Sequence, residues 1–472
     1  MKKLSGFLIV LSLSLLFSLG STVGLASSAP VVKLPVPDIE TLPNGLQVAW
    51  FLNDKLPVVD LAILIKSGSR DDLKGKSGTA ELLSSVLDRG AAGMTAHEIA
   101  AAIESLGATR YAAADDDAFS LGMHGLAPDA PVLLDLLAKL TLEPTFQPEE
   151  VTREKKDLLE HWKHLSDSAE TMSSVVFSRR ITAGTSYGRG AFSSLAEFDH
   201  VNRADLIAFH QTHFTPKNSI LMIVGRVNRE KFREKIIEDF GGWQGEAPQH
   251  KKINFSDGRL KTLPHQIILV DRPGLTQVQV KMGFQVPGIH SQYRTSLAVG
   301  NALLGEYFNS RLNSVIRDQL GLTYSISSAI SYSQEFAYFA VNSATQTATV
   351  GKLIEKTVEI IKDMKSGNIS ADEVRQSKEY LIGGYPLSVS TLGAVASRWL
   401  SGYIYDLGPD YLNGFVKKVT EVEQENVIEA VKKSFDVEHM VIIIAGDAKE
   451  TRKSLAASGY KNIKLVTIKD LQ

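Results

Sequence analysis

The sequence predicts an α+β protein made of two duplicated halves, each a largely antiparallel sheet packed with helices. Three observations support this fold class. The chain has 472 residues, more than one ordinary core of roughly 100–200 residues accounts for. Similar segments recur at a nearly constant distance along the chain. The expected strands also come in groups instead of alternating singly with helices, which is typical of α+β and not of doubly wound proteins.

The composition is that of a globular protein, with 44% hydrophobic and 22% charged residues. The formal net charge of −2 excludes a generally basic nucleic-acid-binding protein, so no nucleic acid is expected as a partner. The absence of cysteine excludes disulfides, thiolate zinc sites and iron–sulfur clusters.

The first residues have the pattern of a secretory signal peptide, expected at 1–29. Two lysines precede the apolar stretch from Phe7 to Leu19, and small residues follow, with cleavage expected near Ala26 or Ala29. The apolar stretch is shorter than the ~20 residues that a membrane span needs. We therefore expect a secreted or periplasmic protein with no membrane span after cleavage.

An internal repeat organises the rest of the chain. Buried strands are predicted at 219–225 and 440–446, and their terminal glycines, Gly225 and Gly446, are 221 positions apart. An amphipathic helix is predicted immediately before each strand. Further upstream, two helix starts place glutamates at positions 150 and 373, which are 223 apart. Such similar offsets indicate duplication of a unit of about 200 residues.

The duplication divides the chain into an N-terminal half (37–243), a polar linker (244–261) and a C-terminal half (262–472). Hydrophobic periodicity and capping residues then predict the elements in order. In the first half these are a strand at 57–66, a helix at 77–88 capped by Ser77, a helix from the capping box Thr95 to Glu98, a strand at 118–126, and helices at 129–140, 148–165 and 203–213. In the second half they are a strand at 277–286, helices at 295–304 and 308–319, a hairpin of 323–332 with 336–343, and a helix at 424–434.

Three stretches of the sequence have a distinctive order of residues. They are Lys66-Ser-Gly-Ser-Arg-Asp-Asp with the following Gly75-Lys-Ser-Gly-Thr-Ala, the stretch from Phe209 to Gly225, and Ser310-Arg-Leu-Asn-Ser-Val-Ile-Arg-Asp-Gln-Leu-Gly-Leu-Thr-Tyr324. Together they resemble the pitrilysin (insulinase) and mitochondrial processing peptidase family of inverzincin metallopeptidases. The resemblance implies the pitrilysin-like metallopeptidase fold, which also has a duplicated layout.

The family's zinc motif, His-x-x-Glu-His, does not occur at the matching place. In the family two imidazoles on one helix face bind zinc, and the glutamate between them activates water. Alignment on Gly78 puts these roles on Glu81, Ser84 and Ser85, and the family's third ligand, a glutamate, falls at His161. The resemblance therefore implies a degenerate site that holds no metal and is inactive alone, with zinc expected in a partner subunit.

Other chemistry on these residues is disfavoured by the pattern. A different metal site from Glu81, Glu160, His161 and His164 is geometrically possible, but ordinary histidines on a charged helix explain the spacing. The serines at 84 and 85 lack a Gly-x-Ser-x-Gly elbow for nucleophilic catalysis. The histidines at 210 and 213 fall in the structural helix-to-strand signature and need no function.

The second half keeps a pair that the family uses. Arg317 and Tyr324, seven positions apart, match an arginine and a tyrosine that in the family reach towards the zinc site of the first half and hold the scissile carbonyl. A guanidinium and a phenol are donors suited to a developing oxyanion. The alternative is a solvated helix cation and a core aromatic, but the matching residues around them, Arg311 and Gly321 among them, favour function.

The resemblance implies an exported pseudoenzyme subunit, because the family contains bacterial heterodimers in which one chain has the zinc triad and a paralogue supplies the arginine and tyrosine. The expected partners are such a zinc-bearing paralogous subunit and a peptide or unfolded protein substrate. Two alternatives stay open. One is a purely structural member that scaffolds an assembly, and the other is a stand-alone peptide-binding degenerate peptidase.

Overall fold

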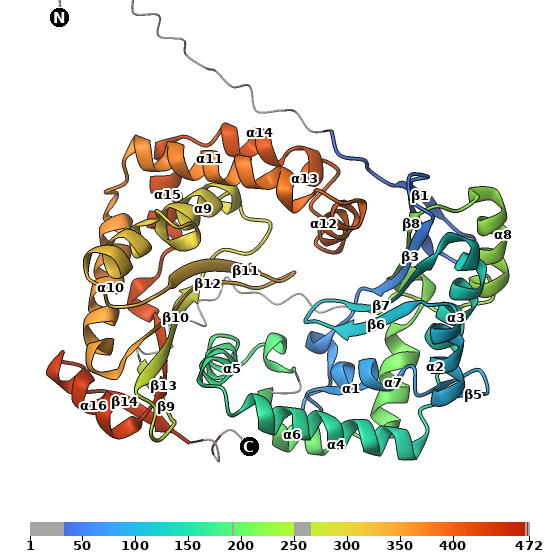
Figure 1. Ribbon diagram of the computed structural model, residues 1–472, viewed down its shortest axis with the longest axis horizontal. Helices are drawn as coiled ribbons and strands as arrows, with labels where there is room; N and C mark the ends of the chain where they lie inside the picture. The colour runs from blue at the N-terminus through green and yellow to red at the C-terminus, as the bar shows by residue number, and fades with distance from the viewer. Residues whose placement is uncertain (1–32, 191–192, 250–265, 468–469, 471–472) are drawn as a thin grey trace, which may run out of the picture. The chain divides into compact units, whose positions relative to one another are not determined.

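The computed structural model describes residues 33–190, 193–249, 266–467 and 470 (Figure 1). The expected signal peptide (1–29) lies outside the described residues, as does the part of the expected linker from residue 250 to 261. Within the described residues, no helix combines the length and the apolar character needed to cross a bilayer.

The first half contains a mixed sheet of six described strands (Figure 1). In spatial order they are β1 (Asp38–Thr41), β2 (Gln47–Leu52), β8 (Ser219–Gly225), β3 (Val58–Ile65), β7 (Phe119–Leu126) and β6 (Thr109–Ala114). A separate short pair is formed by β4 (Gly90–Ala91) and β5 (Met94–Thr95). The helices are α1 (Thr79–Val86), α2 (Ala96–Ser105), α3 (Ala130–Leu142), α4 (Pro148–Leu165), α5 (Ala169–Ile181), α6 (Leu195–Asp199), α7 (Arg203–His213) and α8 (Arg229–Phe240).

The second half contains another sheet of six described strands. In spatial order they are β14 (Ile463–Val466), β9 (Gln266–Asp271), β13 (Val441–Gly446), β10 (Gln277–Gln285), β12 (Ala337–Gln346) and β11 (Ile326–Tyr332). Its α-helices are α9 (Arg294–Asn301), α10 (Val350–Ser366), α11 (Ala371–Ser388), α12 (Leu392–Ile404), α13 (Asp410–Asn413), α14 (Phe415–Thr420), α15 (Gln424–Ser434) and α16 (Ala448–Ala457). Two π-helices, Ala302–Glu306 and Asn313–Gln319, lie between α9 and β11.

The two sheets have the same plan, which confirms the duplicated α+β fold class. In each sheet, one parallel pair (β2 with β8, β9 with β13) is followed by three antiparallel pairings in the same spatial order. The outer edge differs, because β1 comes before β2 in the chain and pairs antiparallel with it, whereas β14 comes last and pairs parallel with β9. Most pairings are antiparallel in both halves, as predicted.

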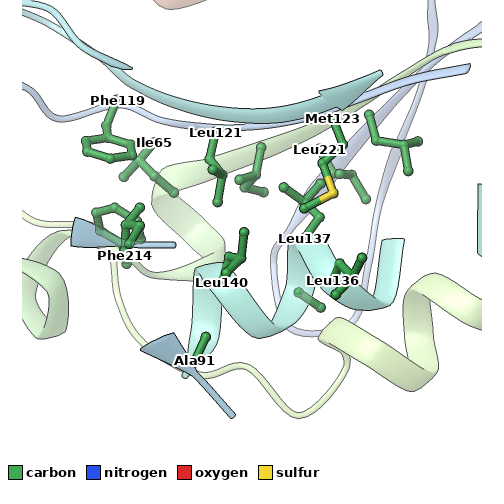
Figure 2. Packing of buried hydrophobic residues seen from close by; sticks show 14 of the residues in the cluster. Ile65, Ala91, Phe119, Leu121, Met123, Leu136, Leu137, Leu140, Phe214 and Leu221 are labelled. Atoms are coloured by element: carbon green, nitrogen blue, oxygen red, sulfur yellow. The ribbon is translucent and has the colours of Figure 1, made fainter. Parts of the chain in front are cut away.

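The core of the first half lies between its sheet and one layer of helices. Alternate residues of a strand face opposite sides of a sheet, so Leu221 and Leu121 point towards α3, where they meet Leu137 and Leu140 (Figure 2). The ring of Phe119 makes an edge-to-face contact with that of Phe214, which follows α7 (Figure 2). The alternating apolar residues that predicted these strands, and the apolar face that predicted the helix at α3, therefore meet in one core.

Residues Lys33–Gln472 form one compact unit. Within it, one helix of each half packs on the sheet of the other half. Helix α5 of the first half packs on β10 and β13 of the second sheet, where Phe177 is fully buried. Helix α12 of the second half packs on β8, where Ala396 is fully buried. The two helices start 223 positions apart, the offset of the repeat. The exchange therefore buries the second face of both sheets.

Two details of the predicted elements were wrong. Ser77 does not cap α1, because Gly78 occupies the N-cap position with a positive φ of 88° and the Ser77 hydroxyl donates to Glu197 instead. The helix predicted from Phe308 begins at Arg311. The turn before it is held by the Asn313 side chain, which donates to the Tyr307 carbonyl.

Candidate functional site

In α1, the helix at the family's zinc position, both serine hydroxyls bond to the backbone of the helix itself. The Ser84 and Ser85 hydroxyls both donate to the Glu81 carbonyl, at 2.7 and 3.3 Å. This is the back-bonding that serine adopts within helices, and it occupies both hydroxyl protons. All three residues are half-buried. One carboxylate and two hydroxyls bonded to the helix backbone do not fit the zinc ligation of the family, in which two imidazoles are required.

Helix α4, which packs against α1, carries the remaining degenerate position. His161 and His164 are both exposed, and Glu160 pairs with Lys156 at 3.7 Å. Among the described residues there is no group of three or more histidine, aspartate or glutamate side chains that could hold a metal ion. The structure therefore does not bring Glu81, Glu160, His161 and His164 together as a ligand set.

A buried aspartate that the sequence reasoning missed fixes the start of α1. The Asp72 carboxylate accepts hydrogen bonds from the backbone N–H groups of Gly78, Thr79 and Ala80, at 2.7, 3.0 and 2.9 Å. Burial raises the pKa of Asp72 to about 8, and these three donors act in the opposite direction. Arg189 donates to the Asp72 carbonyl at 2.7 Å. The loop before α1 is thus held in place although the zinc motif is absent.

A second missed feature is a polar joint between the halves, formed by Arg70, Asp117 and Tyr187 with the turn of the β11–β12 hairpin. Arg70 Nη1 lies 2.6 Å from an Asp117 carboxylate oxygen, to which the Tyr187 hydroxyl donates at 2.9 Å. The other Asp117 oxygen accepts the Gln334 N–H at 2.7 Å, and the Tyr187 oxygen accepts the Glu335 N–H at 3.0 Å. Asp117 is only 2% exposed, so the joint is a buried ion pair that ties the second half to the first.

The aspartate run before β7 explains the joint's electrostatics. Burial raises the pKa of Asp116 to about 6, although the Ser69 hydroxyl donates to it at 2.9 Å. Burial also raises the pKa of Asp117, which the guanidinium of Arg70 opposes. One signal in the sequence was available: Asp115-Asp116-Asp117 runs directly into a buried strand, where three carboxylates cannot all remain solvated.

The structure places Arg317 in the second π-helix, a geometry often found at functional sites. Its Nε and Nη2 donate to the two carboxylate oxygens of Asp318, at 2.7 and 3.2 Å. The guanidinium carbon lies 3.7 Å from the centroid of the Phe308 ring. In the described part of the chain, Arg317 Nη1 donates to no protein acceptor.

The neighbouring motif arginine, Arg311, has a different role. Its Nε and Nη2 donate to the Glu373 carboxylate at 2.5 and 2.8 Å, its Nη1 donates to Asp363 at 3.2 Å, and its Nη2 also donates to the Asn368 carbonyl at 2.6 Å. Burial opposes the charge on Glu373, but the bonds from Arg311 and from the Ser370 N–H and hydroxyl lower its pKa to about 2. Every nitrogen of Arg311 is thus engaged inside the chain, and the residue joins the π-helix region to the start of α11.

Tyr324 is displayed on the surface. It is 95% exposed, an unusual state for a large aromatic side chain. The preceding residue is fixed, because the Thr323 hydroxyl donates to the Ala344 carbonyl of β12 at 2.6 Å. Among the described residues, no hydrogen bond or cation–π contact joins Tyr324 to Arg317. The structure therefore presents both donors without pairing them.

The two histidines of the helix-to-strand signature are bonded inside the first half. His210 Nε2 lies 2.8 Å from the Thr141 carbonyl, and burial lowers the pKa of His210. His213 Nδ1 lies 2.9 Å from the Ser67 hydroxyl. These contacts join α7 to α3 and to the end of β3.

Comparison with known proteins shows which family the chain resembles. Residues 48–190 match the model of the insulinase family (peptidase family M16), and residues 200–381 match that of the peptidase M16 inactive domain. An uncharacterised zinc protease of Mycobacterium leprae is 25% identical over 76% of this chain and 80% of its own length. The zinc protease PqqE of Helicobacter pylori is 24% identical over 79% of this chain and 83% of its own.

Two solved structures share the fold. A peptidase M16 inactive domain from Pseudomonas fluorescens has a TM-score of 0.79 at 21% identity, covering 88% of this chain and 98% of its own. A protease from Helicobacter pylori also has a TM-score of 0.79, at 20% identity, covering 87% of this chain and 100% of its own. The chain belongs to the insulinase (M16) family of metallopeptidases, and its fold is the two-half α+β fold of that family.

Proposed function

We propose that this chain is the exported, non-catalytic subunit of a heteromeric zinc metallopeptidase. It supplies Arg317 and Tyr324 to bind and polarise the scissile carbonyl of a peptide or unfolded protein in the site of a zinc-bearing paralogous partner. The signal-like N-terminus supports a secreted or periplasmic location. The chain itself holds no zinc in this proposal.

The observation that carries the proposal is the contrast between two sets of family positions. Glu81, Ser84 and Ser85 do not supply the two imidazoles and the intervening glutamate of the family's zinc motif, and both hydroxyls are used within the helix. Arg317 and Tyr324 keep the family's residue types, and each has donor capacity that the described chain does not use. Such capacity is what a second chain and its substrate require.

The chemistry of the pair is that of an oxyanion site. The Arg317 Nη1 protons and the Tyr324 phenol donate to the carbonyl oxygen, which gains negative charge when the peptide bond is attacked. Because these bonds strengthen as charge develops, they lower the barrier more than they tighten substrate binding. Removal of one such donor lowers kcat by roughly 10²–10³.

The test is reconstitution with an exported family member that has an intact His-x-x-Glu-His motif, with cleavage of a peptide as the readout. We expect wild-type chain to restore cleavage, and Arg317→Ala and Tyr324→Phe to lower kcat by roughly 10²-fold each. Arg375→Ala is the matched control. Arg375 is an exposed arginine of α11 that pairs with Asp372 and Glu379, and its loss leaves cleavage unchanged.

Three results would contradict the proposal. Cleavage that needs neither this chain nor Arg317 would leave a scaffolding member as the explanation. Turnover by the isolated chain would indicate a degenerate hydrolase acting alone. Stoichiometric zinc in the isolated chain, measured by mass spectrometry of the metal, would remove the division of labour between two subunits.

A further inference from the structure

Phe308, next to Arg317, is an aromatic residue whose position is not explained by packing in the core. Phe308 is 69% exposed, so its ring contributes little to the core. It lies in the turn before the π-helix, nine positions before Arg317, and its centroid is 3.7 Å from the guanidinium carbon. A cation over an aromatic face is attracted to the ring by roughly 0.5–1 kcal/mol at exposed sites. The best-defined contact of this ring is therefore the arginine.

Two different groups hold two different parts of the guanidinium. Phe308 lies against its face, and Asp318 accepts bonds from the edge formed by Nε and Nη2. The side chain of Arg317 is 18% exposed, although that of Asp318 is 50% exposed. A guanidinium has five N–H donors in one plane. Asp318 uses one on Nε and one on Nη2, so both protons of Nη1 and the second proton of Nη2 are left, and Nη1 is the nitrogen without an acceptor among the described residues.

Comparison with a third arginine shows that this arrangement is not general. Arg375 on α11 also pairs with the carboxylates of Asp372 and Glu379, but its side chain is 57% exposed and no aromatic ring covers it among the described residues. Both of its terminal nitrogens are engaged. At Arg317, in contrast to Arg375, a ring and a carboxylate together hold the guanidinium, and Nη1 has no acceptor among the described residues.

We propose that Phe308 and Asp318 are positioning residues that orient Arg317 so that Nη1 donates to the substrate carbonyl. The inference rests on the proposed function and extends it to residues that do not touch the reacting atoms. Holding the guanidinium in advance removes the entropy loss of ordering a long side chain during the reaction. The effect belongs to the transition state, so it changes kcat more than KM.

The first arm of the test needs no partner. The full chain is treated with phenylglyoxal, and modification of Arg317 is followed by peptide mass spectrometry. Phe308→Leu and Asp318→Asn each raise the rate at Arg317 by about two- to fivefold, whereas Phe308→Tyr, which keeps the ring, does not. Asp372→Asn is the matched control, because it removes an equivalent ion pair at Arg375 and leaves the rate at Arg317 unchanged.

The second arm uses the reconstituted pair of subunits and peptide cleavage. Phe308→Leu and Asp318→Asn lower kcat by about three- to tenfold with KM nearly constant. Phe308→Tyr, which keeps the ring, has a kcat close to that of the wild type. If Arg317→Ala lowers kcat while Phe308→Leu and Asp318→Asn do not, the inference is overturned and the proposed function stands. If Arg317→Ala has no effect, both are overturned. Unchanged modification rates in the first arm also overturn the inference.

Discussion

The two halves have the same sheet topology apart from one edge strand, but they differ at the family's functional positions, where serine hydroxyls are bonded within the first half and donors are left unused in the second. In the first half the hydroxyls of Ser84 and Ser85 bond to their own helix. In the second half Arg317 keeps an Nη1 without a protein acceptor among the described residues, and Tyr324 is almost fully exposed. Within one fold, a position that lost its ligand chemistry is satisfied internally, whereas a position that keeps it presents unused donors. The predictions below test this contrast.

The largest expected change is the return of zinc to the first half. Helix α1 still packs on α4, so the combined substitutions Glu81→His, Ser84→Glu, Ser85→His and His161→Glu place the family's ligand types on a retained pair of helices. The purified variant is expected to hold about one zinc per chain after dialysis, measured by metal mass spectrometry, against far less for the wild type. A variant that folds and stays free of zinc would mean that the helix geometry has changed as well as the ligands.

The joint between the halves is expected to give the largest change in stability. Asp117→Ala leaves the Arg70 charge buried and removes the acceptor of the Gln334 N–H. The free energy of unfolding, measured by urea titration, falls by about 3–5 kcal/mol. Asp372→Ala, which removes an exposed ion pair, changes it by about 0–1 kcal/mol. Equal effects of the two substitutions would mean that the buried ion pair contributes no more to the free energy of unfolding than an exposed one.

A smaller effect concerns pH. The pKa of Asp116 is about 6 in the folded chain, above the value of about 4 expected when unfolded. The folded state therefore binds more protons between these values, and its stability falls as pH rises from about 4 to 6. Asp115 and Asp117 favour the protonated form, and Arg70 opposes it.

Asp116→Asn removes this titration. It flattens the pH dependence of the unfolding free energy in that window by up to about 2 kcal/mol, as followed by urea titration at several pH values. Part of the slope remains in the variant, because the pKa of Asp72 is also raised, to about 8. A slope as steep as that of the wild type would show that Asp116 does not contribute to it.

The smallest effect is expected in the emptied site. Ser85→Ala removes a hydroxyl that bonds only within its helix among the described contacts, so the free energy of unfolding changes by less than about 0.5 kcal/mol. Cleavage by the reconstituted pair is unchanged, in contrast to Arg317→Ala. A loss of cleavage comparable to that of Arg317→Ala would show that α1 still takes part in the reaction.

Several strands, helices and motif positions were predicted from the sequence alone. The strands at Ser219–Gly225 and Val441–Gly446 and the helices before them were predicted to within a residue, because hydrophobic periodicity and capping residues are local properties. The absence of the histidine pair and the presence of Arg317 and Tyr324 were also visible, since motif spacing needs no coordinates.

Other features depended on contacts between residues far apart in the chain. Asp117 and Gln334 are 217 positions apart and meet only when both halves are folded. Asp72 holds the start of α1 in place of Ser77 although it lies only six positions before Gly78, because the loop between them folds back over the helix start. The exchange of α5 and α12 was decided by contacts between the two halves. The orientation of Arg317 depends on nearer residues, Phe308 and Asp318, and on the three-dimensional shape of the turn that brings Phe308 against it. A side chain's partners are set by packing in three dimensions, and no local pattern records them.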